Sequence, residues 1–304
     1  MYADIRAFFH ERGVLEVETP VFSLAGNTDP AIDSVVADFS SPFENEASLR
    51  YAHTSPEFAM KRLLAAGSGA IYQICKVFRK EECGRLHRPE FSMLEWYRPG
   101  MSYHALMDEL AELLAWLMPA GRADTERISY ADLFQRELKL DVLSAGVAEL
   151  KDCAHENGLE VVGFDDDYDN WASLLLANLI EPGLGVDNPV FVYDYPSSQA
   201  ALAQIRHEDN IAERFELYIN GVEIANGYQE LTDAQIYLER FENDNKKRKL
   251  SGLAEIKVDH WLIKDILSGF PDSSGVALGL DRLLMVMLNA VDIQEVLHFH
   301  VDDI

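Results

Sequence analysis

Hydrophobic positions near the start of the chain recur with the spacing of a helix. Ile5, Phe8 and Phe9 share one face of the segment 1–12, and charged residues interrupt that segment. This pattern predicts an amphipathic helix and excludes the uninterrupted apolar core of a signal peptide. Gly13 follows it and suits the left-handed conformation past a helix end.

The same periodicity predicts further elements along the chain. Leucines on one stripe predict a helix that Ser102 caps and that runs to Leu117. Other helices are predicted at 56–66, 144–157, 170–180 and 281–289. Runs rich in β-branched and aromatic residues predict strands at 14–22, 71–78, 91–97, 190–195 and 276–280. Helices among largely antiparallel strands make α+β the expected fold class. We expect a single domain over 1–304, with a helical insertion at about 122–184.

The clearest local signal is the two-residue hairpin turn Asn220-Gly221. With that turn, Tyr218 faces Glu223, and alternation places Glu216 on the same surface as Tyr218. Two carboxylates on one surface can converge on a hard divalent cation. The alternative is a pair of solvated acids in an acidic chain, and the hairpin alone favours it.

The net charge of the chain limits the kinds of partner that it is expected to bind. The chain has 52 acidic and 26 basic residues, a formal charge of −26. Such a field repels phosphate backbones, so extended nucleic-acid binding is not expected. The basic run 246–249 is interpreted as a solvated helix face, with docking of an acceptor protein as the alternative.

Cysteine spacing and hydropathy argue against a disulfide framework, a zinc site and a membrane span. Cys75, Cys83 and Cys153 lack C-x-x-C spacing, which argues against a disulfide framework or a zinc site. No apolar run approaches the roughly 18 residues of a membrane span, so a soluble cytoplasmic protein is expected.

Two other segments carry candidate chemistry. Arg79 ends a predicted strand and offers donors to phosphate or carboxylate oxygens, although such arginines are commonly in surface salt bridges. Small residues alternate along 275–279, which allows close approach of a ligand or backbone. The alternative there, a buried strand leading into a packing helix, leaves Arg282 unexplained. Neither a dinucleotide-binding glycine motif nor a P-loop is present.

Taken in order, these segments resemble the motifs of class II aminoacyl-tRNA synthetases. Residues 13–22 resemble motif 1, 78–91 resemble motif 2 and 275–287 resemble motif 3. The segments 55–57, 89–97 and 223–231 are similar to the lysyl branch. The resemblance spans nearly the whole chain, and the motifs are jointly specific.

The resemblance implies a lysyl-type catalytic core without the OB-fold anticodon-binding domain. In this it is similar to the family of ligases that attach (R)-β-lysine to elongation factor P. Ser55 and Ala277 are features shared with that family, and one added methyl group shifts selectivity by about 1–3 kcal/mol. The resemblance also implies ATP, Mg²⁺, a homodimer, elongation factor P as acceptor and no tRNA.

The resemblance further implies roles for individual residues. The catalytic residues are Arg79 and Arg282. The ATP-binding residues are Arg79, Lys80, Glu81, His87, Arg88, Phe91, Glu223, Ile224, Gly279 and Arg282. The substrate-binding residues are Ser55, Pro56, Glu57, Glu95, Tyr97, Asn226, Glu230 and Ala277. Glu216 and Glu223 bind the metal, and Arg88 stands where relatives usually have asparagine.

Two other functions stay open. One is a lysyl-tRNA synthetase-like enzyme that charges RNA, which would need a basic surface for the acceptor stem. The other is a non-catalytic paralogue that senses an amino acid. Such paralogues tend to lose motif arginines or metal carboxylates, and both kinds of residue are present here, so catalysis is favoured.

Overall fold

The fold is known from a computed structural model that describes residues 1–40, 48–80, 82–118 and 124–299. The chain divides into two compact units. Unit 1 is Met1–Met101 with Leu231–Ile304, and unit 2 is Ser102–Glu230. The expected insertion at 122–184 lies inside unit 2, and the expectation of a single domain stays a prediction. Among the described residues, no helix combines the length and apolar character that crossing a membrane requires.

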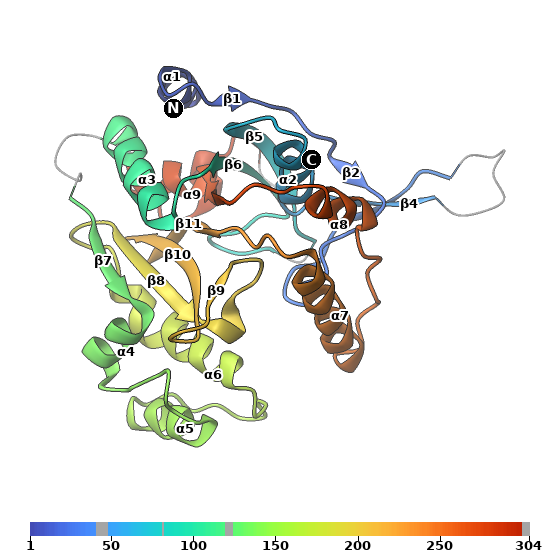
Figure 1. Cartoon of the computed structure of the whole chain (residues 1–304). Helices are drawn as coiled ribbons and strands as arrows, with labels where there is room; N and C mark the ends of the chain where they lie inside the picture. The colour runs from blue at the N-terminus through green and yellow to red at the C-terminus, as the bar shows by residue number, and fades with distance from the viewer. Residues whose placement is uncertain (41–47, 81, 119–123, 300–304) are drawn as a thin grey trace. The chain divides into compact units, whose positions relative to one another are not determined.

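Unit 1 combines a sheet with helices (Figure 1). Its helices are α1 (Tyr2–Glu11), α2 (Glu57–Ala65), α7 (Ala234–Leu250), α8 (His260–Leu267), α9 (Leu280–Leu288) and the short η4 (Ile293–Val296). Its strands are β1 (Leu15–Glu16), β2 (Phe22–Ser23), β3 (Val36–Asp38), β4 (Leu49–Ala52), β5 (Ile71–Phe78), β6 (Glu90–Pro99) and β12 (Ser273–Gly279). Within the unit the strand order is β1-β5-β6-β12, with β1 parallel to β5 and the other pairs antiparallel. A separate antiparallel sheet has the order β2-β4-β3.

Helix α1 covers one face of the larger sheet. Ile5, Phe8 and Phe9 are fully buried, as the helical spacing predicted. The ring of Phe9 stacks on Tyr72 of β5 at 4.4 Å and meets Trp96 of β6 at 5.4 Å. Side chains alternate across a strand, so the residues between these aromatics lie on the opposite face of the sheet.

Several predicted elements of unit 1 are confirmed, and one is divided. The first helix, the helix near residue 56 and the strand 71–78 have the expected type and place. The strand predicted at 14–22 is instead two short strands, β1 and β2. Pro20 lies between them, and proline cannot donate to a strand ladder.

Unit 2 contains a second group of paired strands with helices around them (Figure 1). Its helices are α3 (Tyr103–Leu117), α4 (Tyr130–Leu138), α5 (Val147–Glu156), α6 (Tyr168–Leu175), the π-helical turn η1 (Leu176–Ile180) and the 3-10 turns η2 (Glu181–Gly183) and η3 (Ser197–Gln199). Its strands are β7 (Glu126–Ser129), β8 (Val190–Pro196), β9 (Ile205–Arg206), β10 (Ile211–Ile219) and β11 (Val222–Gln229). The order within the unit is β11-β10-β8-β7, with β9 on β10. The hydroxyl of Ser102 caps α3 by accepting from the amide of Ala105, as predicted.

The hairpin of β10 and β11 confirms the predicted turn and changes the predicted register. Asn220 and Gly221 have φ of 53° and 71°, the conformation that a two-residue hairpin favours. Tyr218 faces Glu223 as expected, but a bulge follows between Leu217 and Tyr218. A bulge sets two residues of one strand against one residue of its partner. Glu216 therefore lies opposite Asn226, which the unbroken register would not place there.

Candidate active site

Arg79 sits where β5 ends and the motif 2 loop begins. Its Nη1 lies 3.1 Å from Oε1 of Glu82, and its Nε donates to the carbonyl of Thr54 at 3.3 Å. Its guanidinium carbon is 5.1 Å from the ring centroid of Phe91, within the range of a cation–π contact. The side chain remains 24% exposed, so it is anchored without being enclosed. Glu81 lies outside the described residues.

His87 and Arg282 bind each other across unit 1. Nη2 of Arg282 is 2.6 Å from Nε2 of His87, and Nε of Arg282 donates to the carbonyl of Leu86 at 3.3 Å. A guanidinium only donates hydrogen bonds, so Nε2 of the imidazole accepts. Burial and the charge of Arg282 lower the pKa of His87 below its ordinary value of 6.5. His87 is therefore neutral at pH 7.

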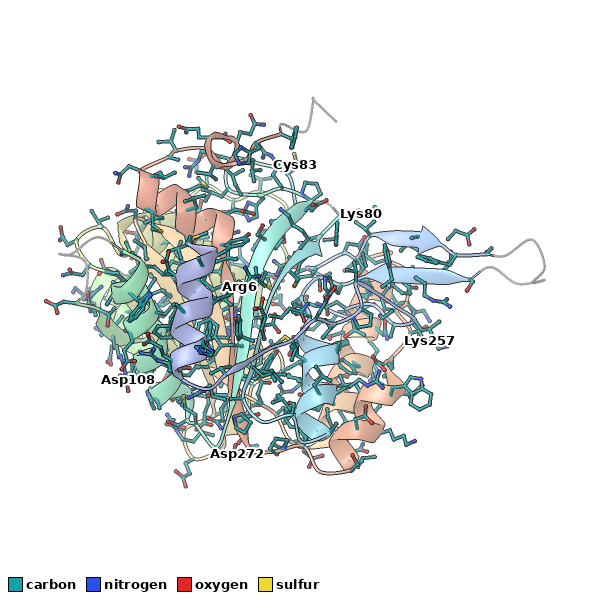
Figure 2. All side chains as sticks on the ribbon, turned by 90° about the horizontal axis from the view of Figure 1, so that it is seen from above. Arg6, Lys80, Cys83, Asp108, Lys257 and Asp272 are labelled. Carbon is teal, nitrogen blue, oxygen red and sulfur yellow. The ribbon has the colours of Figure 1, made fainter. Side chains whose placement is uncertain are left out.

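Arg88 is bound to the backbone of its own loop. It is 6% exposed, and its Nη1 donates to the carbonyls of Gly84 at 2.5 Å and His87 at 2.7 Å. Its Nη2 is 3.6 Å from a carboxylate oxygen of Asp292. These contacts close the motif 2 loop, and the predicted ATP contact of Arg88 stays a prediction. Lys80, by contrast, has a 58% exposed side chain (Figure 2).

The face of the sheet opposite α1 gathers predicted substrate residues in one row. Glu95 of β6 pairs with Ala277 of β12 on one side and with Gln73 of β5 on the other. The hydroxyl of Tyr97 donates to Oε1 of Glu95 at 2.6 Å. Gly275 lies opposite Tyr97, so no side chain crowds the sheet there.

Gln73 is a member of this row that the sequence analysis missed. Its side chain is buried at 2% exposure. The signal was available, because the alternation of β5 and its hairpin with β6 set which residues face Glu95. Cys75 follows on the same face, and burial together with the charge of Glu95 raises the pKa of its thiol to about 12. That thiol is protonated at neutral pH and is no nucleophile.

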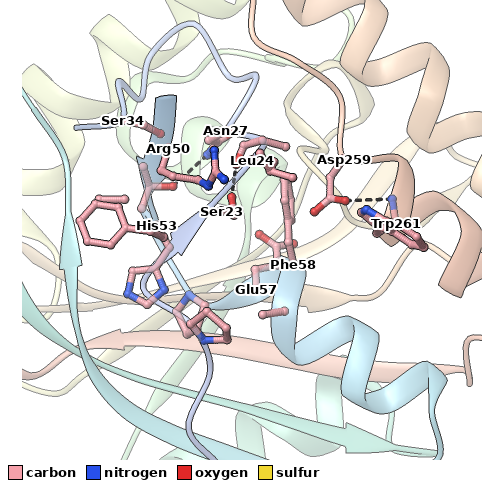
Figure 3. Close-up of a pocket in the computed structure, with 18 of the residues that line it drawn as sticks. Ser23, Leu24, Asn27, Ser34, Arg50, His53, Glu57, Phe58, Asp259 and Trp261 are labelled. Carbon is pink, nitrogen blue, oxygen red and sulfur yellow. Dashed lines mark hydrogen bonds between the residues drawn. The ribbon is translucent and has the colours of Figure 1, made fainter. Parts of the chain in front are cut away.

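Ser55, Pro56 and Glu57 line a cavity of about 490 Å³ in unit 1 (Figure 3). The segments 22–27 and 257–261 form much of the remaining wall. Glu57 is bound by Lys61 one turn further along α2, with Nζ 2.6 Å from Oε1. Lys61 is fully buried and also donates to the hydroxyl of Tyr237 at 3.0 Å. The sequence analysis missed Lys61, although its spacing of four from Glu57 is that of a helical ion pair.

In unit 2, Glu216 is held by a dense set of donors. Its Oε1 accepts from Arg214 at 2.5 Å and from Asn226 at 3.1 Å. Its Oε2 accepts from the hydroxyls of Tyr195 and Tyr218, each at 2.6 Å. A carboxylate offers about four lone-pair sites, and these donors occupy all of them.

The charge of Glu216 also shifts its neighbours. Burial and the charge of Glu216 raise the pKa of both Tyr195 and Tyr218 well above 10. Burial favours loss of the proton from Arg214, but the charges of Glu216, Tyr195 and Glu223 outweigh it and raise the pKa of Arg214. These residues therefore stay fixed as donors across the physiological pH range.

The residue types at the hairpin suit Mg²⁺. Magnesium is commonly bound by one or two carboxylates together with substrate phosphates, and Glu216 and Glu223 supply carboxylates on one surface. Because Glu216 is saturated, a bound ion would displace one of its donors, and Asn226 makes the longest of the four bonds. Among the described residues, no three or more His, Cys, Asp or Glu side chains are grouped as metal ligands.

Each unit thus assembles its own part of the predicted set. In unit 1 the predicted residues are Ser55, Pro56, Glu57, Arg79, Lys80, His87, Arg88, Phe91, Glu95, Tyr97, Ala277, Gly279 and Arg282. In unit 2 they are Glu216, Glu223, Ile224, Asn226 and Glu230. Glu230 is 1% exposed, and its backbone carbonyl accepts from Gln204 at 2.9 Å.

Comparison with known proteins gives a consistent result. A family model described as tRNA synthetases class II (D, K and N) matches residues 1–302. A protein of Histophilus somni (strain 2336) named elongation factor P--(R)-beta-lysine ligase is 48% identical over 301 residues, covering 99% of this chain and 92% of that protein. Proteins of the same name from Enterobacter sp. (strain 638) and Edwardsiella ictaluri (strain 93-146) are 48% and 49% identical, each covering 98% of this chain and 92% of the relative.

Proposed function

The chain belongs to the family of class II tRNA synthetases (D, K and N), and on that premise we propose that it is an elongation factor P--(R)-β-lysine ligase. It activates (R)-β-lysine with ATP as an aminoacyl-adenylate and transfers it to a lysine ε-amine of elongation factor P. The name that relatives 48% identical over 99% of the chain carry supports this assignment. The geometric observation that carries it is Arg79, anchored beside Phe91 and still partly exposed.

ATP binds, in this proposal, along the motif 2 and motif 3 residues. Members of the family generally use ATP and Mg²⁺. The adenine ring lies between Phe91 and Arg282, and Glu81 accepts from its exocyclic amine. Arg79 contacts the α-phosphate, and His87 reaches the outer phosphates. The remaining ATP contacts are proposed for Lys80, Arg88, Ile224 and Gly279.

The first step forms the adenylate. The carboxylate oxygen of the amino acid attacks the α-phosphorus, and the bond to the pyrophosphate leaving group breaks. Arg79 stabilises the charge that develops on the phosphoryl oxygens, so no enzyme nucleophile is needed. Mg²⁺ held by Glu216 and Glu223 supplies neutralisation of phosphate charge when it is bound. Asn226, which makes the longest of the four bonds to Glu216, would then give up that bond and free a lone pair.

The two amines of the substrate require ionised partners. A buried ammonium without a paired carboxylate is strongly unfavourable, and Glu230 is proposed to bind the side-chain amine of the substrate. Tyr97 is proposed as a further substrate-binding residue. Glu57 or Glu95 binds the other amine. Ser55, Pro56, Asn226 and Ala277 complete the amino-acid site.

The second step transfers the acyl group. The ε-amine of the acceptor lysine attacks the carbonyl carbon of the adenylate, AMP leaves, and an amide forms. The amine loses a proton in the process, which AMP or solvent takes up. The acidic composition of the chain supports a protein acceptor over a tRNA. A homodimer is proposed because motif 1 forms the interface in the family that the sequence resembles.

The test is ATP–pyrophosphate exchange with (R)-β-lysine, (S)-β-lysine and α-lysine, each supplied alone. We expect the fastest exchange with (R)-β-lysine, followed by stable labelling of elongation factor P. Exchange with α-lysine only, together with charging of tRNA, would replace this proposal with the tRNA synthetase. No exchange with any of the amino acids would identify a non-catalytic binding protein.

A further inference from the structure

The basic run 246–249 at the end of α7 does not lie on one surface. Lys246, Lys247 and Lys249 are exposed, whereas Arg248 is buried with 2% exposure. The interpretation of the run as a solvated helix face is therefore wrong for Arg248. A buried guanidinium is costly unless its donors and its charge are matched, so its partners indicate its role.

The partners of Arg248 lie in two loops of unit 1. Its Nη2 donates to Oδ1 of Asp33 at 2.9 Å, and its Nη1 donates to the carbonyl of Asp29 at 3.2 Å. Its Nε donates to the carbonyl of Ala254 at 2.8 Å. A second bond from the same helix runs beside these, because Asp244 accepts from the hydroxyl of Thr28 at 2.8 Å. Helix α7 thus holds the segment 27–33, here called the 27–33 loop.

The 27–33 loop in turn contacts residues next to Arg79, beginning with Lys80. The carbonyl of Asp33 accepts from the amide of Lys80 at 2.9 Å, and its carboxylate lies 3.7 Å from Nζ of Lys80.

The second contact runs through Asn27, which lies in the wall of the cavity in Figure 3. Its Nδ2 donates to Oγ1 of Thr54 at 3.3 Å. The carbonyl of Thr54 then accepts from Nε of Arg79 at 3.3 Å. The 27–33 loop therefore contacts both the backbone after Arg79 and the residue that its side chain binds.

We propose that Arg248 and Asp33 are positioning residues that fix the 27–33 loop and, through it, the guanidinium of Arg79 for adenylate formation. This inference rests on the proposed function, in which Arg79 contacts the α-phosphate. Neither residue touches the substrate. Small misplacement of a group that binds the transition state lowers the rate much more than it changes ground-state binding.

Lysine cannot replace Arg248 in this arrangement. The planar guanidinium reaches acceptors on Asp33, Asp29 and Ala254 through separate nitrogen atoms. An ammonium is a compact point charge on a flexible stem and cannot reproduce that fork. Arg248→Lys therefore tests geometry at constant charge.

The experiment compares Arg248→Met, Arg248→Lys and Asp33→Asn with the matched control Lys249→Met, the exposed neighbour in the same run. ATP–pyrophosphate exchange gives kcat and the KM for ATP, and thermal unfolding shows whether each variant is folded. Amide hydrogen exchange over 27–33 and 78–80 reports directly whether the 27–33 loop is held in place, and it does not depend on any substrate. Asp33→Asn keeps the size of the side chain, so the test stands even if Arg248→Met does not fold.

We expect Arg248→Met to lower kcat by about 10- to 100-fold while the KM for ATP changes by less than about threefold. The kcat of Arg248→Lys is expected to lie between those of Arg248→Met and the wild type. The kcat of Lys249→Met is expected to match that of the wild type. The amide of Lys80 exchanges faster in Arg248→Met and Asp33→Asn than in Lys249→Met, without faster exchange across β5 and β6.

Two results would overturn the inference. One is a folded Arg248→Met variant with the kcat of Lys249→Met. The other is unchanged exchange of the Lys80 amide. If the wild-type protein shows no pyrophosphate exchange with any lysine isomer, the proposed function fails. Hydrogen exchange then still decides whether Arg248 and Asp33 fix the 27–33 loop.

Discussion

Arg79 in the motif 2 loop and Glu216 in the hairpin differ in how exposed their charged groups are and in how many partners bind them. Arg79 pairs with Glu82, and both side chains are about a quarter exposed, at 24% and 27%. The Glu216 side chain is 9% exposed and accepts hydrogen bonds from four different residues.

This difference separates a carboxylate that is fully bound before any ligand arrives from an arginine that can still bind a ligand. A buried carboxylate with every lone pair in use is fixed before any ligand arrives, and its surroundings depend on its charge. A partly exposed arginine contributes little to folding and can exchange its partner for a ligand. We therefore expect substitution of the buried Glu216 to affect stability first, and substitution of Arg79 to affect catalysis first.

The largest effect is expected for Glu216→Gln. The substitution removes the charge that matches Arg214 and turns an amide group toward donors, and breaking a buried pair costs about 3–5 kcal/mol. Urea denaturation measures the loss in the free energy of unfolding. Glu223→Gln, on the same surface, is expected to lose activity with a much smaller loss of stability. Equal stability of Glu216→Gln and the wild type would contradict the buried network.

Arg79→Lys is expected to show the reverse behaviour. A lysine keeps the charge but loses the fork that matches phosphate oxygens, so kcat for pyrophosphate exchange should fall about 100-fold or more. The midpoint of thermal unfolding should stay close to that of the wild type. Arg85→Lys is the control, because Arg85 is in the same loop and its Nη1 donates to a backbone carbonyl, that of Val291, at 3.0 Å. Similar kinetics of the two variants would remove Arg79 from the active site.

A third comparison uses two neighbouring cations of α2. Lys61→Met removes the buried partner of Glu57 and should lower the free energy of unfolding by about 1–3 kcal/mol. Arg62 pairs with Asp265 at 2.6 Å, but these side chains are 42% and 30% exposed. Arg62→Met should therefore cost less than about 1 kcal/mol. Chemical denaturation of both variants measures the difference, and equal losses would show that burial of Lys61 does not matter.

The smallest expected effect is a pH dependence from His87. Because its pKa is lowered in the folded protein, the unfolded chain binds the proton more readily. The stability that the neutral imidazole provides is complete above the ordinary pKa of 6.5 and falls as the pH drops below that value toward the folded pKa. An NMR titration should give a pKa for His87 below 6.5, and His87→Asn should weaken the acid sensitivity of unfolding. A titration midpoint above that value would contradict the Arg282 contact.

Local signals in the sequence predicted many elements correctly. The helix of Ile5, Phe8 and Phe9, the cap at Ser102 and the turn at Asn220-Gly221 each depend on residues close in the chain. Their physical causes are equally local, namely helical periodicity, side-chain capping and positive φ. The predicted roles of the site residues depend on the family resemblance and await the tests above.

Other features were not predicted, either because tertiary packing decides them or because a local signal was missed. The bulge at Leu217 and Tyr218 shifts the register by one residue, and nothing in the turn chemistry indicates it. The partner of Glu57 is a lysine that is fully buried, although lysine is among the residues least often buried. Gln73 faces Glu95 because of how β5 pairs with β6.

The sequence by itself determined the fold class, most helices and strands, the hairpin turn and the family. These follow from short-range patterns and from motifs whose order is preserved along the chain. The tertiary structure alone decided which charges are buried and what satisfies them. Arg248 and Lys249 are adjacent and chemically alike, yet Arg248 is buried against the distant 27–33 loop and the nearby Ala254, whereas Lys249 is exposed. The physical reason is that desolvation and pairing depend on neighbours in space, which the linear order of residues does not specify.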